Sequence, residues 1–232
     1  MLKKKAVIFV LLMSVTLAGC AGKANGRRRE AEALLEEKYR EEFTVTEYDG
    51  QEMGRRYYAV TAYSDSLPDL PFAANVDADG SGVSDGYVCR KVCRKISDRV
   101  YENLSDIIPY DIYVHTGMLS EDSVCADPNI SIEEFTAEWE PDNRYYIYVH
   151  IDNRNWDKTD IEGYLPYALS GLSCLKGNIT VYFSDKDTME KAKEYVDTHT
   201  GLFDGYFDLV ERKAKVEWVQ YGIEDGMVLE QF

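Results

Sequence analysis

Apolar residues recur at helical spacing in several stretches between residue 30 and the carboxyl terminus. Helices are therefore predicted over residues 28–41, 86–104 and 185–198, with a broken helix between 159 and 175 and a short one after Ser131. The strongest stripe repeats every four residues: Val88, Val92, Ile96, Val100 and Leu104. Ser84 or Asp85 is expected to cap that helix, and Ser184 the helix over 185–198.

Other stretches alternate apolar with polar residues or are rich in β-branched and aromatic residues, which is typical of strands. These are residues 43–48, 56–63, 72–76, 110–115, 145–151, 179–183, 206–212 and 214–221. The pairs Leu67-Pro68 and Leu70-Pro71 are expected to interrupt the strand pattern, because proline lacks an N–H group. The last ten residues are acidic and are expected to pack loosely.

Strand pairs come first and strands then alternate with helices, an order that favours an α+β fold. We expect a mixed or largely antiparallel sheet with helices packed on a face. Residues 30–232 are expected to form a single domain, since this length suits one medium-sized core. Residues 110–115 are similar in sequence to residues 145–150. The similarity fits either two related strand–helix units or two unrelated strands that both favour β-branched and aromatic residues.

The first twenty residues carry a targeting pattern. Lys3, Lys4 and Lys5 precede an apolar run over 6–17, which is too short to span a membrane and fits the core of a signal peptide. Leu17-Ala18-Gly19-Cys20 follows, and it resembles the lipobox of bacterial membrane lipoproteins. The alternative is an ordinary signal peptide in which Cys20 is incidental.

The resemblance implies cleavage before Cys20, a diacylglyceryl group on its sulfur and often a fatty acyl group, such as palmitate, on the new amine. Residues 1–19 would be the signal peptide, and 20–29 the lipidated cysteine and a basic tether. The expected location is then the extracytoplasmic side of a cell membrane, where the lipid anchor is the contact with the bilayer. An envelope protein or a membrane-embedded protein is the expected kind of partner.

The net charge of the chain indicates which classes of partner it can bind. The chain has 26 basic and 42 acidic residues, a formal net charge of −16. A nucleic-acid partner is not expected, because binding phosphates needs a basic face. Loss of the leader would remove three lysines and no acidic residue, so the mature protein favours neutral or cationic partners.

Four cysteines remain besides Cys20, namely Cys89, Cys93, Cys125 and Cys174. An exported chain can form disulfides, and four cysteines allow three connectivities, which stay open here. The simpler interpretation is that they are small buried residues. A zinc site is not expected, because a second close-spaced pair is missing.

One loop resembles the first half of a calcium-binding loop. Asp77, Asp79, Ser81 and Asp85 alternate with other residues around Gly82, as oxygen ligands do in such loops. Val88 stands where the bidentate glutamate belongs, so the alternative is a polar turn shaped by aspartate and glycine. Apart from this calcium, no cofactor is expected.

The echoed strands supply a second candidate site. Alternation puts Tyr113 with His115, and Tyr148 with His150, on one side of each strand. If the strands are neighbours, these four side chains share one face and can form a binding site. With Asp111 or Asp152 nearby, that site could bind a metal or act as an acid and base. The alternative is two polar-face histidines without a function.

The familiar catalytic motifs are missing from the sequence: there is no His-Glu-x-x-His, Gly-x-Ser-x-Gly, P-loop or dinucleotide-binding glycine motif. No catalytic residue is assigned. The sequence favours a non-catalytic binding or interaction module, and its 18 tyrosines suit a recognition face. An envelope hydrolase, a small solute receptor and a calcium-stabilised module remain as alternatives.

Overall fold

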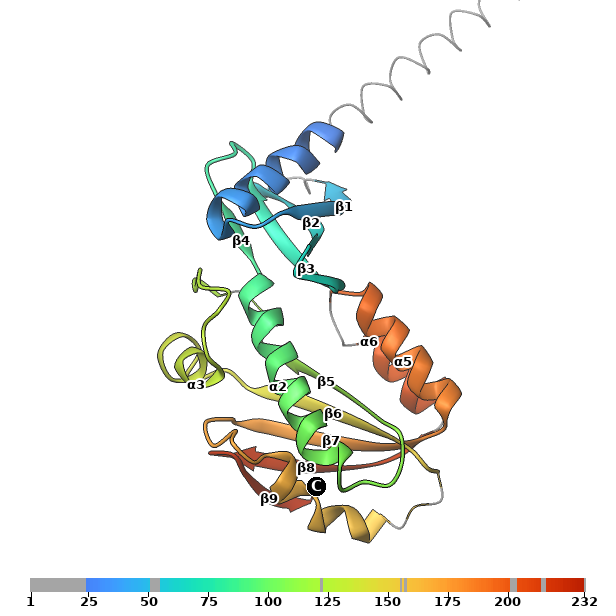
Figure 1. The fold of residues 1–232 in the computed structure, drawn as a ribbon. Helices are drawn as coiled ribbons and strands as arrows, with labels where there is room; N and C mark the ends of the chain where they lie inside the picture. The colour runs from blue at the N-terminus through green and yellow to red at the C-terminus, as the bar shows by residue number, and fades with distance from the viewer. Residues whose placement is uncertain are drawn as a thin grey trace, which may run out of the picture. The chain divides into compact units, whose positions relative to one another are not determined.

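A computed structural model describes residues 24–50, 55–121, 123–154, 156, 158–200, 204–213 and 216–231. The chain gathers into two compact units, Met1–Ser66 with Ala73–Ser84, and Leu67–Phe72 with Asp85–Phe232. Residues 30–232, expected to form one domain, thus contribute to two units. Both units combine helix and sheet, as Figure 1 shows.

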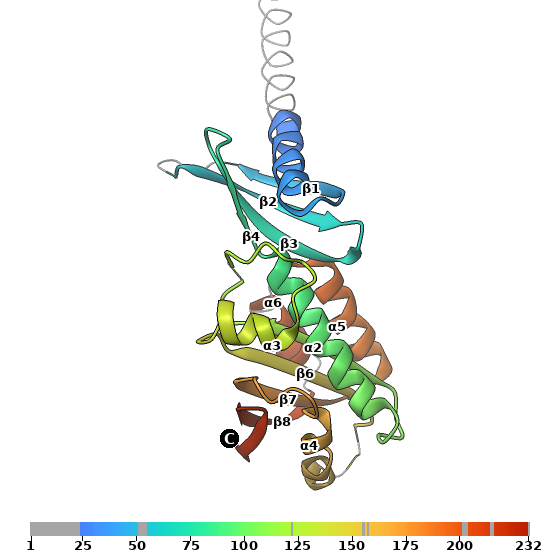
Figure 2. The same cartoon turned by 60° about the vertical axis from the view of Figure 1, so that its left-hand side comes forward.

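The first unit packs a helix on a sheet. The helix covers residues 24–39, and the strands of the sheet are β1 (Phe43–Gly50), β2 (Tyr57–Ser64), β3 (Leu67–Asp77) and β4 (Val83–Asp85), in the order β1-β2-β3-β4. Within these strands, Leu67–Phe72 of β3 and Asp85 of β4 belong to the second unit. Ala31, Leu35 and Tyr39 recur every four residues and are buried, so one face of the helix meets the sheet (Figure 2).

The helix begins before the expected start. Residues 24–29, assigned to the tether from the sequence, are helical. Arg27 explains part of this, because its guanidinium binds Glu30 and the carbonyl of Ala78 and lies over the ring of Tyr58. The Tyr58 hydroxyl donates to the Arg27 carbonyl at 3.1 Å and ties the first turn to β2.

The expectation that prolines interrupt the third strand is wrong. Strand β3 runs through Pro68 and Pro71. Its neighbour β4 has only three residues against eleven in β3, so most of β3 has a free edge on that side. A proline whose nitrogen faces a free edge removes no ladder hydrogen bond. Pro68 and Pro71 are three residues apart, so their nitrogens face opposite edges of β3 and the free edge accounts for one of the two.

The second unit is built on a five-stranded sheet in the order β5-β6-β7-β8-β9. The strands are β5 (Ile112–Met118), β6 (Tyr145–Asp152), β7 (Gly177–Ser184), β8 (Glu217–Glu224) and β9 (Met227–Gln231). Only β6 and β7 pair in parallel, and the other neighbours are antiparallel. The predicted α+β class, with antiparallel and mixed sheets, is confirmed.

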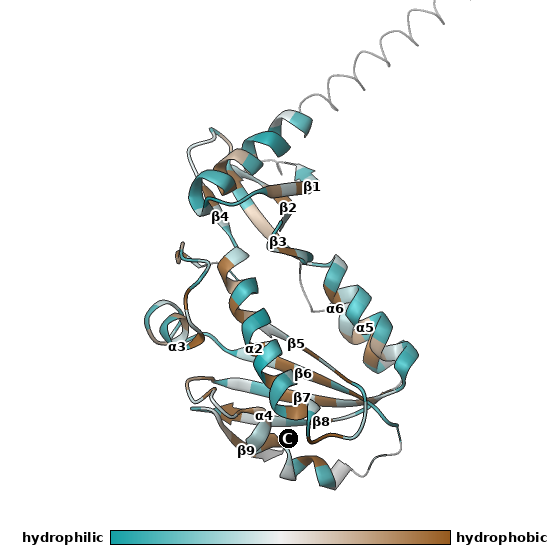
Figure 3. Ribbon diagram, in the orientation of Figure 1, coloured by the Kyte–Doolittle hydropathy of each residue, from teal (hydrophilic) through white to brown (hydrophobic). Residues whose placement is uncertain are grey.

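Helix α2 (Tyr87–Ser105) packs on one face of this sheet. Its predicted stripe is buried, and Ser97 donates to the hydroxyl of Thr116 on β5 at 3.0 Å. On the sheet side, the apolar residues of three strands meet in register, as in Ile147 beside Ile179 and Val149 beside Val181. Figure 3 shows the resulting apolar colour along the strands.

Helices α5 (Lys186–Thr198) and α6 (Asp204–Phe207) and a π-helical segment (Asp208–Lys213) lie against the opposite face. Residues 206–212 were predicted as a strand, and that prediction is wrong. Tyr206 and Val210 are one helical turn apart and fully buried, packed against Tyr148 and Tyr182 of the sheet. A short apolar run suits either element, and tertiary packing decides it.

Shorter elements connect the strands. They are α3 (Ile132–Glu134) with a π-helical turn (Phe135–Trp139), a 3₁₀ turn (Lys158–Gly163) and α4 (Leu165–Ala168). Ser131 caps α3 as expected, since its side chain accepts from the Glu134 N–H at 3.0 Å.

Two local predictions need correction. The cap of α5 is Asp185, whose carboxylate accepts from the Thr188 N–H at 2.9 Å, and not Ser184. The last residues form a hairpin of β8 and β9 around Asp225-Gly226, which both have positive φ, at 49° and 68°. An Asp-Gly pair is the usual signal of such a two-residue turn.

Candidate functional site: a cavity beside strand β5

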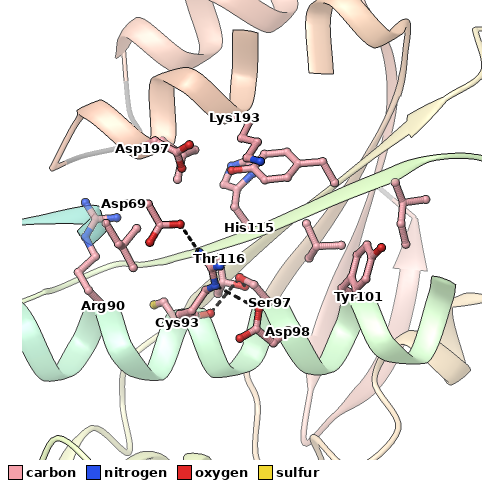
Figure 4. Close-up of a pocket in the computed structure, with 16 residues that line it drawn as sticks. Asp69, Arg90, Cys93, Ser97, Asp98, Tyr101, His115, Thr116, Lys193 and Asp197 are labelled. Carbon is pink, nitrogen blue, oxygen red and sulfur yellow. Dashed lines mark hydrogen bonds and ion pairs between the residues drawn. The ribbon is translucent and has the colours of Figure 1, made fainter. Parts of the chain in front are cut away.

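A cavity of about 390 Å³ lies along strand β5, between α2 and α5. Every residue that lines it belongs to the second unit. Figure 4 shows Arg90, Cys93 and Ser97 reaching it from α2, and Lys193 and Asp197 from α5. Its size is at the small end of the range for ligand pockets.

Strand β5 forms the wall of the cavity with its unpaired edge. It is the first strand of the sheet. At its two ends, the Asp152 N–H donates to the Asp111 carbonyl, and the Leu119 N–H donates to the Arg144 carbonyl. In an antiparallel ladder every second residue is hydrogen-bonded to the neighbouring strand. The main-chain N–H and C=O groups of odd-numbered residues of β5 therefore point toward β6. The N–H and C=O groups of even-numbered residues therefore point outward.

The residues whose main-chain groups point away from β6 are Ile112, Val114 and Thr116, and all three line the cavity. Val114 and Thr116 are only 8% and 5% exposed. No described residue hydrogen-bonds their main-chain groups. Because buried main-chain donors and acceptors are nearly always paired, this edge has unused hydrogen-bonding capacity.

His115 adds an unpartnered side chain. It lines the cavity and is 4% exposed, and both of its ring nitrogens lack a hydrogen-bond partner among the described residues. Its ring stacks on Tyr148 with centroids 4.8 Å apart. Burial, with smaller effects from His150 and Arg90, lowers the pKa of His115 well below its usual range. The imidazole is therefore neutral and offers one donor and one acceptor.

His150 lies one strand away and differs in having partners. Its Nδ1 is 3.0 Å from the Ser184 hydroxyl, and its Nε2 contacts the Tyr206 hydroxyl. Burial lowers the pKa of His150 to about 3. His150 is thus a satisfied core residue that holds α6 against the sheet, while His115 is the histidine that is open to a ligand.

The rim of the cavity carries charges of both signs. Arg94 bridges Asp69 and Asp98, with N–O distances of 3.4 and 3.1 Å. Asp197 has no hydrogen bond or ion pair with any residue that the structure describes. Burial, followed by the charge of Asp69, raises the pKa of Asp197, while the charges of Lys193 and Arg94 partly offset this rise. An unpaired carboxylate at this rim favours a cationic group on a ligand.

Two further groups complete the wall. Arg90 is 2% exposed and is held by Glu121, with Nε and Oε2 3.2 Å apart, and by the Thr200 carbonyl. Tyr113 lies near Asp197, and burial, then that charge, raises the pKa of its phenol. Arg90 is therefore structural, whereas the Tyr113 hydroxyl has no hydrogen-bond partner in the described chain.

The four predicted binding residues do come together. Strands β5 and β6 are neighbours, with Tyr113 opposite His150 and His115 opposite Tyr148. Only Tyr113 and His115 line the cavity, while Tyr148 and His150 are buried in the aromatic core beside it. Whether any of the four binds a ligand stays a prediction.

The candidate calcium loop forms a compact turn. Asp79 accepts from the Ser81 hydroxyl and N–H at 2.6 and 3.0 Å, and Asp77 accepts from the same hydroxyl at 3.3 Å. Asp85 instead accepts from the Tyr87 N–H at 3.0 Å, at the start of α2. In the described part of the chain, no group of three or more histidine, cysteine or acidic residues is placed to hold a metal.

Cys89, Cys93, Cys125 and Cys174 are free thiols, and the first three are buried. Burial raises the pKa of the Cys93 thiol, which lines the cavity in its neutral form. Cys20 lies outside the described residues. Among those that are described, no helix is both long and apolar enough to cross a membrane.

Sequence reasoning missed most of the cavity. Asp69, Arg94 and Asp197 come from three separate segments and meet only in the fold. Lys193 and Asp197 had a faint signal, since they are four residues apart and share one face of α5.

No family model and no curated protein matches this sequence. Its fold is similar to the crystal structure of a DUF5037 family protein from Ruminococcus gnavus, with a TM-score of 0.61. The two chains are 16% identical, and the match covers 88% of this chain and 94% of the other. At this level of identity the likeness concerns the fold alone.

Proposed function

We propose that this protein is a lipid-anchored binding module on the extracytoplasmic side of a cell membrane, with the β5 cavity as its ligand site. The observation that carries the binding role is the buried imidazole of His115 in the wall of that cavity, for which the described part of the chain supplies no hydrogen-bond partner. A buried polar group without a partner is costly, and a bound ligand would remove that cost.

The anchoring part of the proposal rests on the sequence. Three lysines, an apolar run and Leu17-Ala18-Gly19-Cys20 occur in the order that lipoprotein signals require. Two or more acyl chains hold a protein firmly at a bilayer, because each buried CH₂ contributes about 0.8 kcal/mol.

Metabolic labelling with an alkyne analogue of palmitate tests the anchor in cells that express the full chain. We expect label on the wild type and none on Cys20→Ala. Cys174→Ala is the matched control, since it removes a half-buried cysteine of the folded part and should keep the label. Equal labelling of wild type and Cys20→Ala would refute lipidation.

A photoreactive amino acid tests the cavity. Tyr101 lies at its rim and is 47% exposed, so p-benzoylphenylalanine at this position can capture what binds there. Tyr167 is 61% exposed, does not line the cavity and serves as the control position. We expect an adduct of defined mass at position 101 only. Adducts that do not differ between the two positions would refute the ligand site.

A further inference from the structure

The unpaired edge of β5 indicates what kind of molecule the cavity takes. Hydrogen-bonding groups of three residues point into the cavity at every second position, from Ile112 to Thr116. This spacing matches the main chain of an extended peptide, which presents its own N–H and C=O groups in the same rhythm.

Resting on the proposed function, we infer that the cavity binds a short extended peptide, which adds to the edge of β5 as a sixth strand and carries a basic residue toward Asp197. No covalent step is involved. The peptide supplies partners for the main-chain groups of Val114 and Thr116, which no described residue supplies.

The dimensions agree with a peptide of a few residues. Strand residues rise by about 3.4 Å each, so the edge from Ile112 to Thr116 is about 14 Å long. Helices α2 and α5 flank this edge (Figure 4), and Asp69 and Leu70 of β3 also line the cavity of about 390 Å³, so the site is limited to a peptide of a few residues.

Side chains on both sides of the edge define the preferred sequence. The neutral imidazole of His115 can pair with a hydroxyl or amide side chain of the peptide. The Asp197 carboxylate, unpaired within the described chain, favours lysine or arginine over glutamate. The acidic balance of the whole chain, −16, favours the same choice.

Affinity selection tests the inference. The full chain, purified from membranes in detergent, is exposed to a random library of acetylated and amidated tetrapeptides. We expect enrichment of peptides with a lysine or arginine. Asp197→Asn should weaken their binding at least about tenfold and remove the preference for a basic residue. Glu194→Gln, on the exposed side of α5, is the matched control and should bind as the wild type does.

N-methylation of the enriched peptides tests the strand geometry without altering the protein. Two sets of peptides are compared, one methylated on the nitrogens of odd positions and one on those of even positions. One set should lose binding and the other should bind nearly as before, because only every second N–H faces β5. Equal effects in both sets, or no enrichment at all, would overturn the inference.

A variant of β5 provides the reciprocal test. Ile112→Pro removes one outward N–H at the first residue of the strand, where the ladder with β6 is not affected. We expect it to weaken peptide binding at least about tenfold more than Ile112→Ala, which loses the side chain but keeps the N–H. Equal binding by the two variants counts against strand addition.

The failures of the two proposals are distinguishable. An adduct of a non-peptide at position 101 would leave the ligand site standing and refute the peptide. Adducts that are the same at positions 101 and 167 would remove the ligand site itself, and the peptide with it.

Discussion

At the scale of single residues, two histidines in adjacent strands have opposite roles. His150 has a partner on each ring nitrogen, whereas His115, which is also buried, has no hydrogen-bond partner among the described residues. Sequence periodicity could place both on one face, because alternation in a strand is regular. It could not distinguish them, since Ser184 and Tyr206 reach His150 only through the fold.

Both histidines make stability depend on pH. The unfolded chain takes up protons near pH 6.5, whereas His150 stays neutral in the folded protein down to about pH 3, and the pKa of His115 is lowered as well. The contribution of these two histidines to the unfolding free energy is therefore fully present above pH 6.5 and is lost as the pH falls. Between about pH 6.5 and 5, His150 should lower the unfolding free energy by up to about 2 kcal/mol, and His115 should lower it as well.

Urea denaturation at about pH 7 and pH 5 checks this prediction. His150→Gln and His115→Gln should each reduce the loss of unfolding free energy between the two conditions. His199→Gln is the control, because His199 is exposed. A pH dependence that is the same in all three variants would contradict the assignment.

At the scale of elements, most helices and strands follow from local pattern and their ends from local chemistry. The stripe on α2 and the cap of α3 lie where the sequence places them. Residues 206–212 were missed because a short apolar run carries no decisive period. The hairpin of β8 and β9 has a clear signal in Asp225-Gly226, but the acidic composition of the last ten residues favours loose packing instead.

The cap of α5 leads to a first prediction at this scale. Asp185→Ala removes the acceptor for the Thr188 N–H and should lower the unfolding free energy by about 1 kcal/mol. Asp187→Ala is the control, since Asp187 is exposed and forms an ion pair with Lys191 one turn away. Thermal denaturation of both variants gives the comparison. Equal losses would mean that the cap contributes nothing.

The start of β7 leads to a second one. Gly177 has φ of +145°, and a Cβ there would lie 1.9 Å from the Tyr145 carbonyl oxygen on β6. Gly177→Ala should therefore cost about 3 kcal/mol or more, because neither main chain can move without breaking the parallel pair. Gly163→Ala meets open space and should be nearly neutral. Chemical denaturation distinguishes the two.

At the scale of the whole molecule, the chain forms two compact units, and strand β3 contributes Leu67–Phe72 to the second and Ala73–Asp77 to the first. The order of elements predicted the α+β class but not this division, because the second unit takes a segment from each side of Ala73–Ser84. Local pattern says nothing about which distant segments meet. The cavity was unpredictable for the same reason.

This division should be visible in unfolding. All three tryptophans, Trp139, Trp156 and Trp218, belong to the second unit. Tryptophan fluorescence therefore follows that unit alone, while far-ultraviolet circular dichroism follows both. We expect urea transitions that do not coincide between the two probes, because separate units need not unfold together. Coincident transitions would indicate one cooperative unit.

The position of β5 between α2 and α5 has a consequence for self-assembly. A bare sheet edge is a template on which other copies of a chain can polymerise, and a covering helix is a common protection. Edge β5 is shielded in this way on both sides, whereas β9 ends the sheet with Met227 65% and Leu229 48% exposed. Of the two edges of this sheet, β9 is therefore the one on which another copy of the chain can add, while the ligand edge is protected.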